Sequence, residues 1–194
     1  MPFINEDGYN YARTTNSSWI KTREDVGSGC KGVNLLENFE HGDWASGDSS
    51  ACSDLYKGAS VMSSPSTAYQ AEKAARRQYI KFSLTLTKNG NKISFPHAYS
   101  TTNIIPEAVD YAQYAGAYAQ AAASSPSAAS YTVGSYANNH GVNHGHPLDF
   151  NYKQYGHSFN LALEGDEANI VAKTEEFIAG LHAMITHAKT QQGF

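Results

Sequence analysis

The chain has 194 residues, with 14 Lys or Arg, 18 Asp or Glu and a formal net charge of −4. This length is enough to bury a core, and 13 Tyr with 8 Phe argue against a disordered chain, which is usually poor in aromatic residues. Nucleic-acid binding needs a clustered basic face, so the negative charge makes nucleic acid an unexpected partner.

The first third of the chain differs in composition from the rest. Residues 1–64 are rich in Gly, Ser, Asp and Asn and have no sustained hydrophobic period, which predicts a loop-rich arm or extension. Residues 65–194 are predicted to form an α+β domain, and the whole to be one compact unit. Cys30 and Cys52 leave two interpretations open, a disulfide or two reduced thiols.

Two features of the sequence bear on localisation. The first residues lack the basic and apolar regions of a secretory signal, and no stretch approaches the run of about 20 apolar residues that crosses a bilayer. We therefore expect a soluble protein without a membrane span, and favour a virion or an intracellular array over classical secretion.

Strand patterns predict a small antiparallel sheet. Apolar residues alternate with polar ones from Ile80 to Leu86, the segment 88–91 resembles a turn, and Ile93 and Phe95 resume the apolar face. This pattern predicts a hairpin over about 79–95. Further strands are predicted at about 130–136 and 157–164.

Two or three helices are expected to cover this sheet. They are predicted over about 66–78, 106–123 and 167–189. In the middle helix, Tyr111, Tyr114 and Tyr118 form a stripe beside an alanine stripe. Such a stripe is typical of ordinary packing or of a subunit contact, and we assign it, with Trp19 and Phe3 of the arm, to subunit contacts.

A histidine-rich segment is the strongest indication of chemistry. Its candidate metal ligands are His140, His144, His146, Asp149 and His157, since imidazole is a common ligand of transition metals. Zinc or another divalent transition metal is therefore the candidate cofactor. The spacing matches no zinc signature, and the alternative is a polar loop whose side chains bond backbone groups. No catalytic residue can be assigned.

The sequence thus leads to three hypotheses about function. Low charge, the Tyr/Ala/Asn/Gly composition and the arm favour a non-enzymatic structural protein that assembles with itself, as a homo-oligomer or lattice in a virion, filament or ordered array. The first alternative is a metal-dependent hydrolase that uses the His140–His157 segment. The second is a secreted toxin or binding module with a Cys30–Cys52 disulfide.

Overall fold

The structure is a computed structural model that describes residues 4–77, 79–88, 90–165 and 167–192. The chain forms two compact units, Met1–Ser83 with Val142–His157, and Leu84–Gly141 with Ser158–Phe194; we call them unit 1 and unit 2. The expected division at residue 64, between an arm and an α+β domain, stays a prediction. None of the described helices combines the length and the apolarity that a membrane-spanning helix requires.

A four-stranded mixed sheet forms the centre of unit 2. Its strands are β1 (Phe82–Lys88), β2 (Lys92–Phe95), β3 (Thr132–Ser135) and β4 (His157–Leu163), in the order β1-β4-β2-β3. Strand β2 runs antiparallel to β4 and parallel to β3.

The predicted hairpin and the small antiparallel sheet are therefore wrong. The strand segments themselves were found, but β4 lies between β1 and β2. Alternation fixes which face of a strand is buried and does not fix its neighbour. Asn89, in the expected turn, lies outside the described residues.

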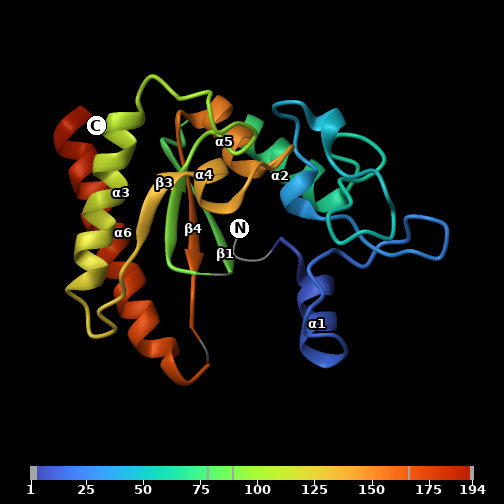
Figure 1. Cartoon of the computed structure of the whole chain (residues 1–194), viewed down its shortest axis with the longest axis horizontal. Coiled ribbons are helices and arrows are strands. Elements are labelled where there is room, and N and C mark those ends of the chain that lie inside the picture. The colour runs from blue at the N-terminus through green and yellow to red at the C-terminus, as the bar shows by residue number, and fades with distance from the viewer. Residues whose placement is uncertain (1–3, 78, 89, 166, 193–194) are drawn as a thin grey trace. The chain divides into compact units, whose positions relative to one another are not determined.

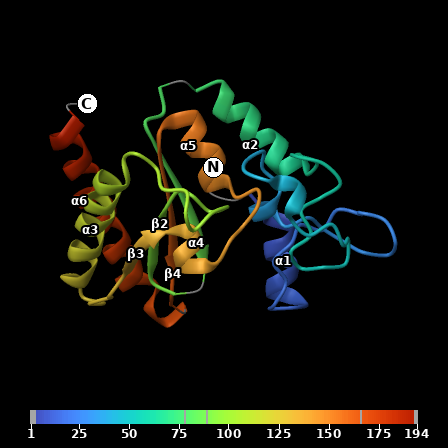
Figure 2. The ribbon, with the colours of Figure 1, turned by 45° about the horizontal axis from the view of Figure 1, so that its top comes forward.

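Helix α3 (Ala108–Ala123) packs against β2, β3 and α6 (Ile170–Gln192), and both views show α3 and α6 side by side (Figures 1 and 2). The predicted helices over 106–123 and 167–189 are thus confirmed. Tyr111, Tyr114 and Tyr118 are at most 1% exposed, and the Tyr111 ring stacks on Phe159 with centroids 4.9 Å apart. Their assignment to a subunit contact is therefore wrong, because they fill the core of unit 2.

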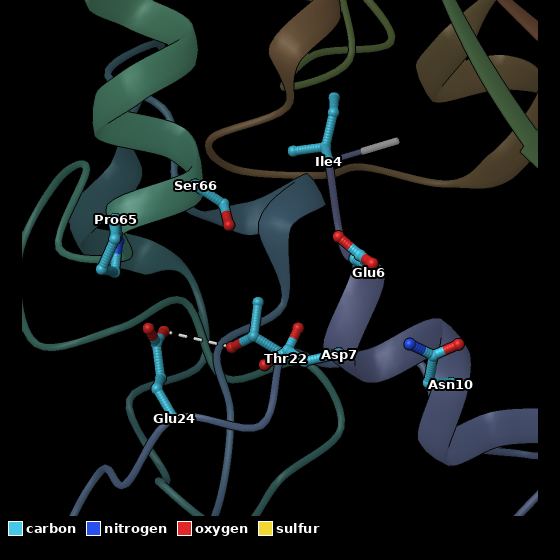
Figure 3. Close-up of a pocket in the computed structure, with 8 residues that line it drawn as sticks. All are labelled: Ile4, Glu6, Asp7, Asn10, Thr22, Glu24, Pro65 and Ser66. Carbon is cyan, nitrogen blue, oxygen red and sulfur yellow. Dashed lines mark hydrogen bonds between the residues drawn. The ribbon is translucent and has the colours of Figure 1, made fainter. Parts of the chain in front are cut away.

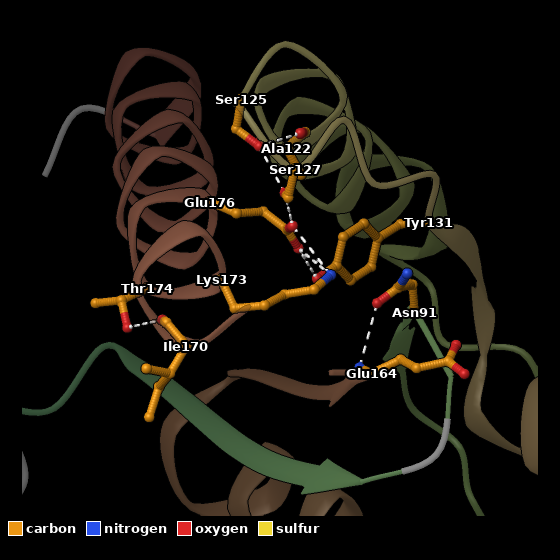
Figure 4. A network of polar contacts seen from close by, with 10 residues as sticks. All are labelled: Asn91, Ala122, Ser125, Ser127, Tyr131, Glu164, Ile170, Lys173, Thr174 and Glu176. Atoms are coloured by element: carbon orange, nitrogen blue, oxygen red, sulfur yellow. Dashed lines mark hydrogen bonds and ion pairs between the residues drawn. The ribbon is translucent and has the colours of Figure 1, made fainter. Parts of the chain in front are cut away.

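A buried carboxylate joins α6 to the segment that follows α3 (Figure 4). Glu176 is fully buried, accepts hydrogen bonds from the hydroxyls of Ser127 and Tyr131, and pairs with Lys173 at 3.1 Å. Burial alone raises the pKa of the Glu176 carboxyl, but these bonds outweigh burial and leave its pKa lowered. The ionised form therefore holds the loop against the helix.

Unit 1 is rich in loops. It contains α1 (Glu6–Thr14), α2 (Pro65–Ala75), α5 (Pro147–Tyr155) and the short 3-10 helices η1 (Leu35–Glu37) and η2 (Trp44–Ser46). Phe39, Ala74 and Phe150 form a buried cluster, which joins the N-terminal loops to α2 and α5. Cys30 and Cys52 form a disulfide with Cα atoms 5.0 Å apart, so the structure has the bridge rather than two thiols.

Candidate functional site

The carboxyl ends of the parallel strands β2 and β3 lie at one edge of the sheet in unit 2. Phe95 pairs with Ser135 at the ends of these strands. His97 follows β2, and the short helix α4 (Tyr136–His140) follows β3. The backbone N–H of Ala137 donates to the carbonyl of His97 at 3.2 Å. Ligands of open α/β sheets bind outside the carboxyl ends of strands, so this edge is the candidate functional site.

One imidazole, His97, follows β2 at this edge, and a second, His140, lies at the end of α4. His97 is 8% exposed, and its ring centroid is 4.7 Å from that of Tyr99. His140 stacks on Tyr136 with centroids 4.5 Å apart, and its pKa is lowered by burial and by the charge of Lys92. His140 is therefore neutral at physiological pH, the form of imidazole that binds metals or accepts a proton.

Polar contacts fix α4 on the strand beneath it. Lys92 Nζ donates to the carbonyl of Asn139 at 2.6 Å, and Asn139 Nδ2 donates to Ser94 Oγ at 2.9 Å. Ser94 is fully buried in β2. These bonds hold His140 in place before any ligand arrives, which is the arrangement that precise ligand geometry requires.

The predicted metal ligands are not gathered into one site in the part of the chain that the structure describes. No group of three or more His, Cys, Asp or Glu side chains able to hold a metal ion occurs among the described residues. His140 belongs to unit 2, whereas His144, His146, Asp149 and His157 belong to unit 1.

Several of these residues have structural surroundings instead. His146 is the N-cap of α5, where its Nδ1 accepts from the N–H of Leu148 at 3.1 Å. Asp149 is buried in the first turn of the same helix, where a negative charge is favoured by the helix dipole. The ring of His157 lies 6.0 Å from that of Phe82. The histidine-rich segment therefore contains α4 and α5.

A buried carboxyl in unit 1 was not found by sequence analysis. Glu37, at the end of η1, is 8% exposed, and its Oε1 accepts from Asn143 Nδ2 at 2.7 Å. Burial, followed by the charge of Asp48, raises the pKa of Glu37 to about 8. No local pattern could have indicated this, because Asn143 lies 106 residues away in the sequence.

An open hollow of about 490 Å³ in unit 1 is lined by eight residues (Figure 3), which are Ile4, Glu6, Asp7, Asn10, Thr22, Glu24, Pro65 and Ser66. Asp7 accepts from the backbone N–H groups of Gly8 and Arg23. Glu24 accepts from the hydroxyl of Thr22 at 3.1 Å. These two carboxylates stabilise the local chain, so the hollow by itself does not indicate a ligand.

Two further residues, Trp19 and Phe3, were predicted to make subunit contacts. Trp19 is half-buried in unit 1, where its ring meets that of Tyr11 edge-on at 5.2 Å. Its indole N–H donates to the carbonyl of Lys21 at 2.6 Å. Trp19 thus packs within its own unit, and its assignment to a subunit contact is corrected. Phe3 lies outside the described residues.

Comparison with known proteins identifies the family. The zinc carboxypeptidase family matches residues 1–189, so the chain belongs to this family. It is 35% identical over 114 residues to carboxypeptidase B of Bos taurus, a match that covers 57% of this chain and 25% of the relative. It is 46% identical over 61 residues to carboxypeptidase B of Astacus astacus, covering 30% of this chain and 20% of the relative. The matches thus span about a quarter or less of these relatives.

A solved structure has the same fold. It is described as bovine thrombin-activatable fibrinolysis inhibitor in complex with tick carboxypeptidase inhibitor, and it aligns with a TM-score of 0.93 over 98% of this chain and 69% of that chain. The identity of 24% makes this a likeness of fold alone, the α/β fold with a mixed sheet.

These comparisons overturn the leading functional hypothesis. Membership of the zinc carboxypeptidase family contradicts the predicted non-enzymatic virion, filament or array component, so the structural class and the expectation that the chain is not an enzyme are wrong. The expected homo-oligomer or lattice depended on that class, so it is wrong for the same reason. The similar solved structure is described as a complex with an inhibitor. The hydrolase that was kept as an alternative agrees with the family.

Proposed function

We propose that the protein is a zinc-dependent carboxypeptidase, which hydrolyses the last peptide bond of a peptide and releases its C-terminal residue. The family match over residues 1–189 carries this proposal, and the likeness of fold supports it. Zinc in such enzymes polarises the carbonyl that is attacked and activates a water molecule.

The described side chains do not supply a complete zinc site. A catalytic zinc takes three protein ligands, which in carboxypeptidase A are two histidines and a glutamate. The described residues contain no group of three candidate ligands. A zinc site of this kind therefore requires at least one ligand from outside them.

His97 is the described residue that we assign to one ligand position. It is a buried imidazole two residues after the end of β2, at the edge of the sheet where ligands of α/β folds bind. Its backbone carbonyl is bonded to α4, so its position is fixed by two elements. Removal of one ligand from a zinc site should lower both zinc affinity and activity.

A matched pair of substitutions tests this assignment. His97→Gln should reduce zinc content, measured by elemental analysis after dialysis, and should reduce the release of C-terminal residues in proportion. His182→Gln alters an exposed histidine of α6 in the same unit, and it should leave both quantities unchanged. A folded His97→Gln protein with full zinc content and full activity would reject the assignment.

A further inference from the structure

A second hollow in unit 1, of about 290 Å³, lies against the disulfide. Its lining combines cations, an aromatic ring and the two half-cystines, in the residues Trp19, Lys21, Arg23, Gly29, Cys30, Lys31 and Cys52. Three of these side chains are cationic, in a chain whose net charge is −4. Like charges that lie close together repel one another unless an opposite charge is near. The charged partner of each cation therefore decides how much positive charge the hollow keeps.

Arg23 lies against two aromatic rings. Its guanidinium carbon lies 3.7 Å from the Tyr11 ring centroid and 4.5 Å from that of Trp19. In the described part of the chain, neither a hydrogen bond nor an ion pair involves this guanidinium. A guanidinium is planar, and its N–H donors can make two parallel bonds to an oxyanion.

The rings that hold Arg23 are themselves fixed. Trp19 Nε1 donates to the carbonyls of Lys21 and Thr22 at 2.6 and 3.3 Å, and the Tyr11 and Trp19 rings meet edge-on. Cys30 and Cys52, which form the disulfide, also line the hollow. The site is therefore largely formed in advance, which lowers the entropic cost of binding.

The two lysines add positive potential but are partly balanced. Lys31 pairs with Asp25 at 2.7 Å. Lys21 is 2% exposed, donates to the carbonyl of Ala51 at 3.1 Å, and feels the charges of Asp54 and Asp48. Arg23 is thus the cation of the hollow whose charge lacks a described carboxylate partner.

We propose that this hollow binds an oxyanion, a carboxylate or a phosphate group, through the edge of Arg23, with Lys21 and Lys31 supplying positive potential and Trp19 an apolar wall. The volume leaves room for the organic group that carries the anion as well as for the anion itself. A carboxylate source would be an acidic side chain or a small organic acid, and a phosphate source would be inorganic phosphate or a phosphate ester.

Nuclear magnetic resonance of the indole N–H groups tests the proposal directly. The chain has two tryptophans, so Trp19 reports on the hollow and Trp44 serves as an internal reference. Sodium phosphate, sodium glutarate and N-acetylglutamate amide are titrated at constant ionic strength. We expect a saturable shift of the Trp19 signal with at least one of these probes, and no shift of the Trp44 signal.

Substitution then separates recognition from packing. Arg23→Gln should raise the Kd about tenfold, the effect of losing one charge-assisted pair, and Lys31→Gln should raise it less. Arg13→Gln is the control, since Arg13 also lies over a tyrosine ring, at 5.7 Å from the Tyr9 centroid, but does not line the hollow; it should keep the Kd within about twofold.

Each outcome bears on the proposal. Binding of phosphate alone or of the carboxylates alone supports the site and names its anion. Absence of a saturable Trp19 shift with all three probes overturns it. So does an equal Kd in the wild-type protein and in a folded Arg23→Gln variant, because Arg23 would then only pack against its rings. If Arg23→Gln fails to fold, the smaller rise in Kd expected for Lys31→Gln still tests the site. Peptide hydrolysis is not measured here, so the result is independent of the proposed activity.

Discussion

Glu37→Gln should make unit 1 less sensitive to alkaline pH. The pKa of Glu37 rises from its ordinary value of 4.5 to about 8 in the folded protein, first through burial and then through the charge of Asp48. The folded state therefore holds a proton that the unfolded state has lost. The stability that depends on this proton is fully present below pH 4.5 and is lost as the pH rises through about 8.

The size of the effect follows from the shift. Each pKa unit corresponds to about 1.4 kcal/mol, so between pH 5 and pH 8 the free energy of unfolding should fall by roughly 3–4 kcal/mol through Glu37 alone. Glutamine has the same shape, does not titrate, and its amide oxygen can still accept from Asn143 Nδ2. The variant should therefore match the wild-type protein near pH 5 and exceed its stability at pH 8 by about that amount.

Urea unfolding followed by circular dichroism at several pH values measures this difference. Glu40→Gln, at an exposed position close in sequence, controls for the loss of one carboxylate. Parallel pH dependences of the Glu37→Gln and wild-type proteins would refute the argument, since the pKa of Glu37 would then be the same in the folded and unfolded states.

Further substitutions test the interactions within each unit. A Cβ added at Gly180 would lie 2.6 Å from a tyrosine ring of α3, whereas one at Gly116 would meet nothing within 4 Å. Gly180→Ala should therefore lower the free energy of unfolding by about 1–3 kcal/mol. Gly116→Ala should raise it by about 0.5–1 kcal/mol, and calorimetry measures both changes. Replacing Cys30 and Cys52 by serine removes a bridge between residues 22 apart in sequence, which should cost about 3 kcal/mol in chemical denaturation. Glu176→Gln should weaken unit 2 above pH 4.5 and flatten its loss of stability in acid, because the lowered pKa of Glu176 makes stability fall as the pH falls through its folded pKa; an unchanged acid transition would contradict this.

Local sequence patterns predicted where helices and strands lie in the chain better than which elements lie beside one another. The strand at β1 and the helices α3 and α6 follow from hydrophobic periodicity, which is a property of the segment itself. The insertion of β4 between β1 and β2 depends on a segment about 70 residues further along the chain, and no turn or spacing records it. The tyrosine stripe was found, but a core face and a contact face have the same period, so its partner could not be read from the sequence.

The site was harder to predict than the fold. Histidine spacing suggested one metal site, yet His146 caps a helix and His140 lies in the other unit. His97 stands alone in the sequence, and only its place after β2 distinguishes it. Low charge and abundant tyrosine favoured a structural protein. That hypothesis was wrong because such a composition does not specify chemistry. Function depends on the site rather than on such averages.

The most direct test of the central claim is the release of a C-terminal residue by the purified protein after metal removal and zinc restoration. Two peptides of identical sequence are compared by mass spectrometry, one with a free C-terminal carboxylate and one amidated. A zinc carboxypeptidase should shorten the free peptide by one residue when zinc is present, should leave the amidated peptide intact, and should lose activity in the presence of a chelator. No release from the free peptide by folded, zinc-treated protein, or release that persists with the chelator, would contradict the proposed function.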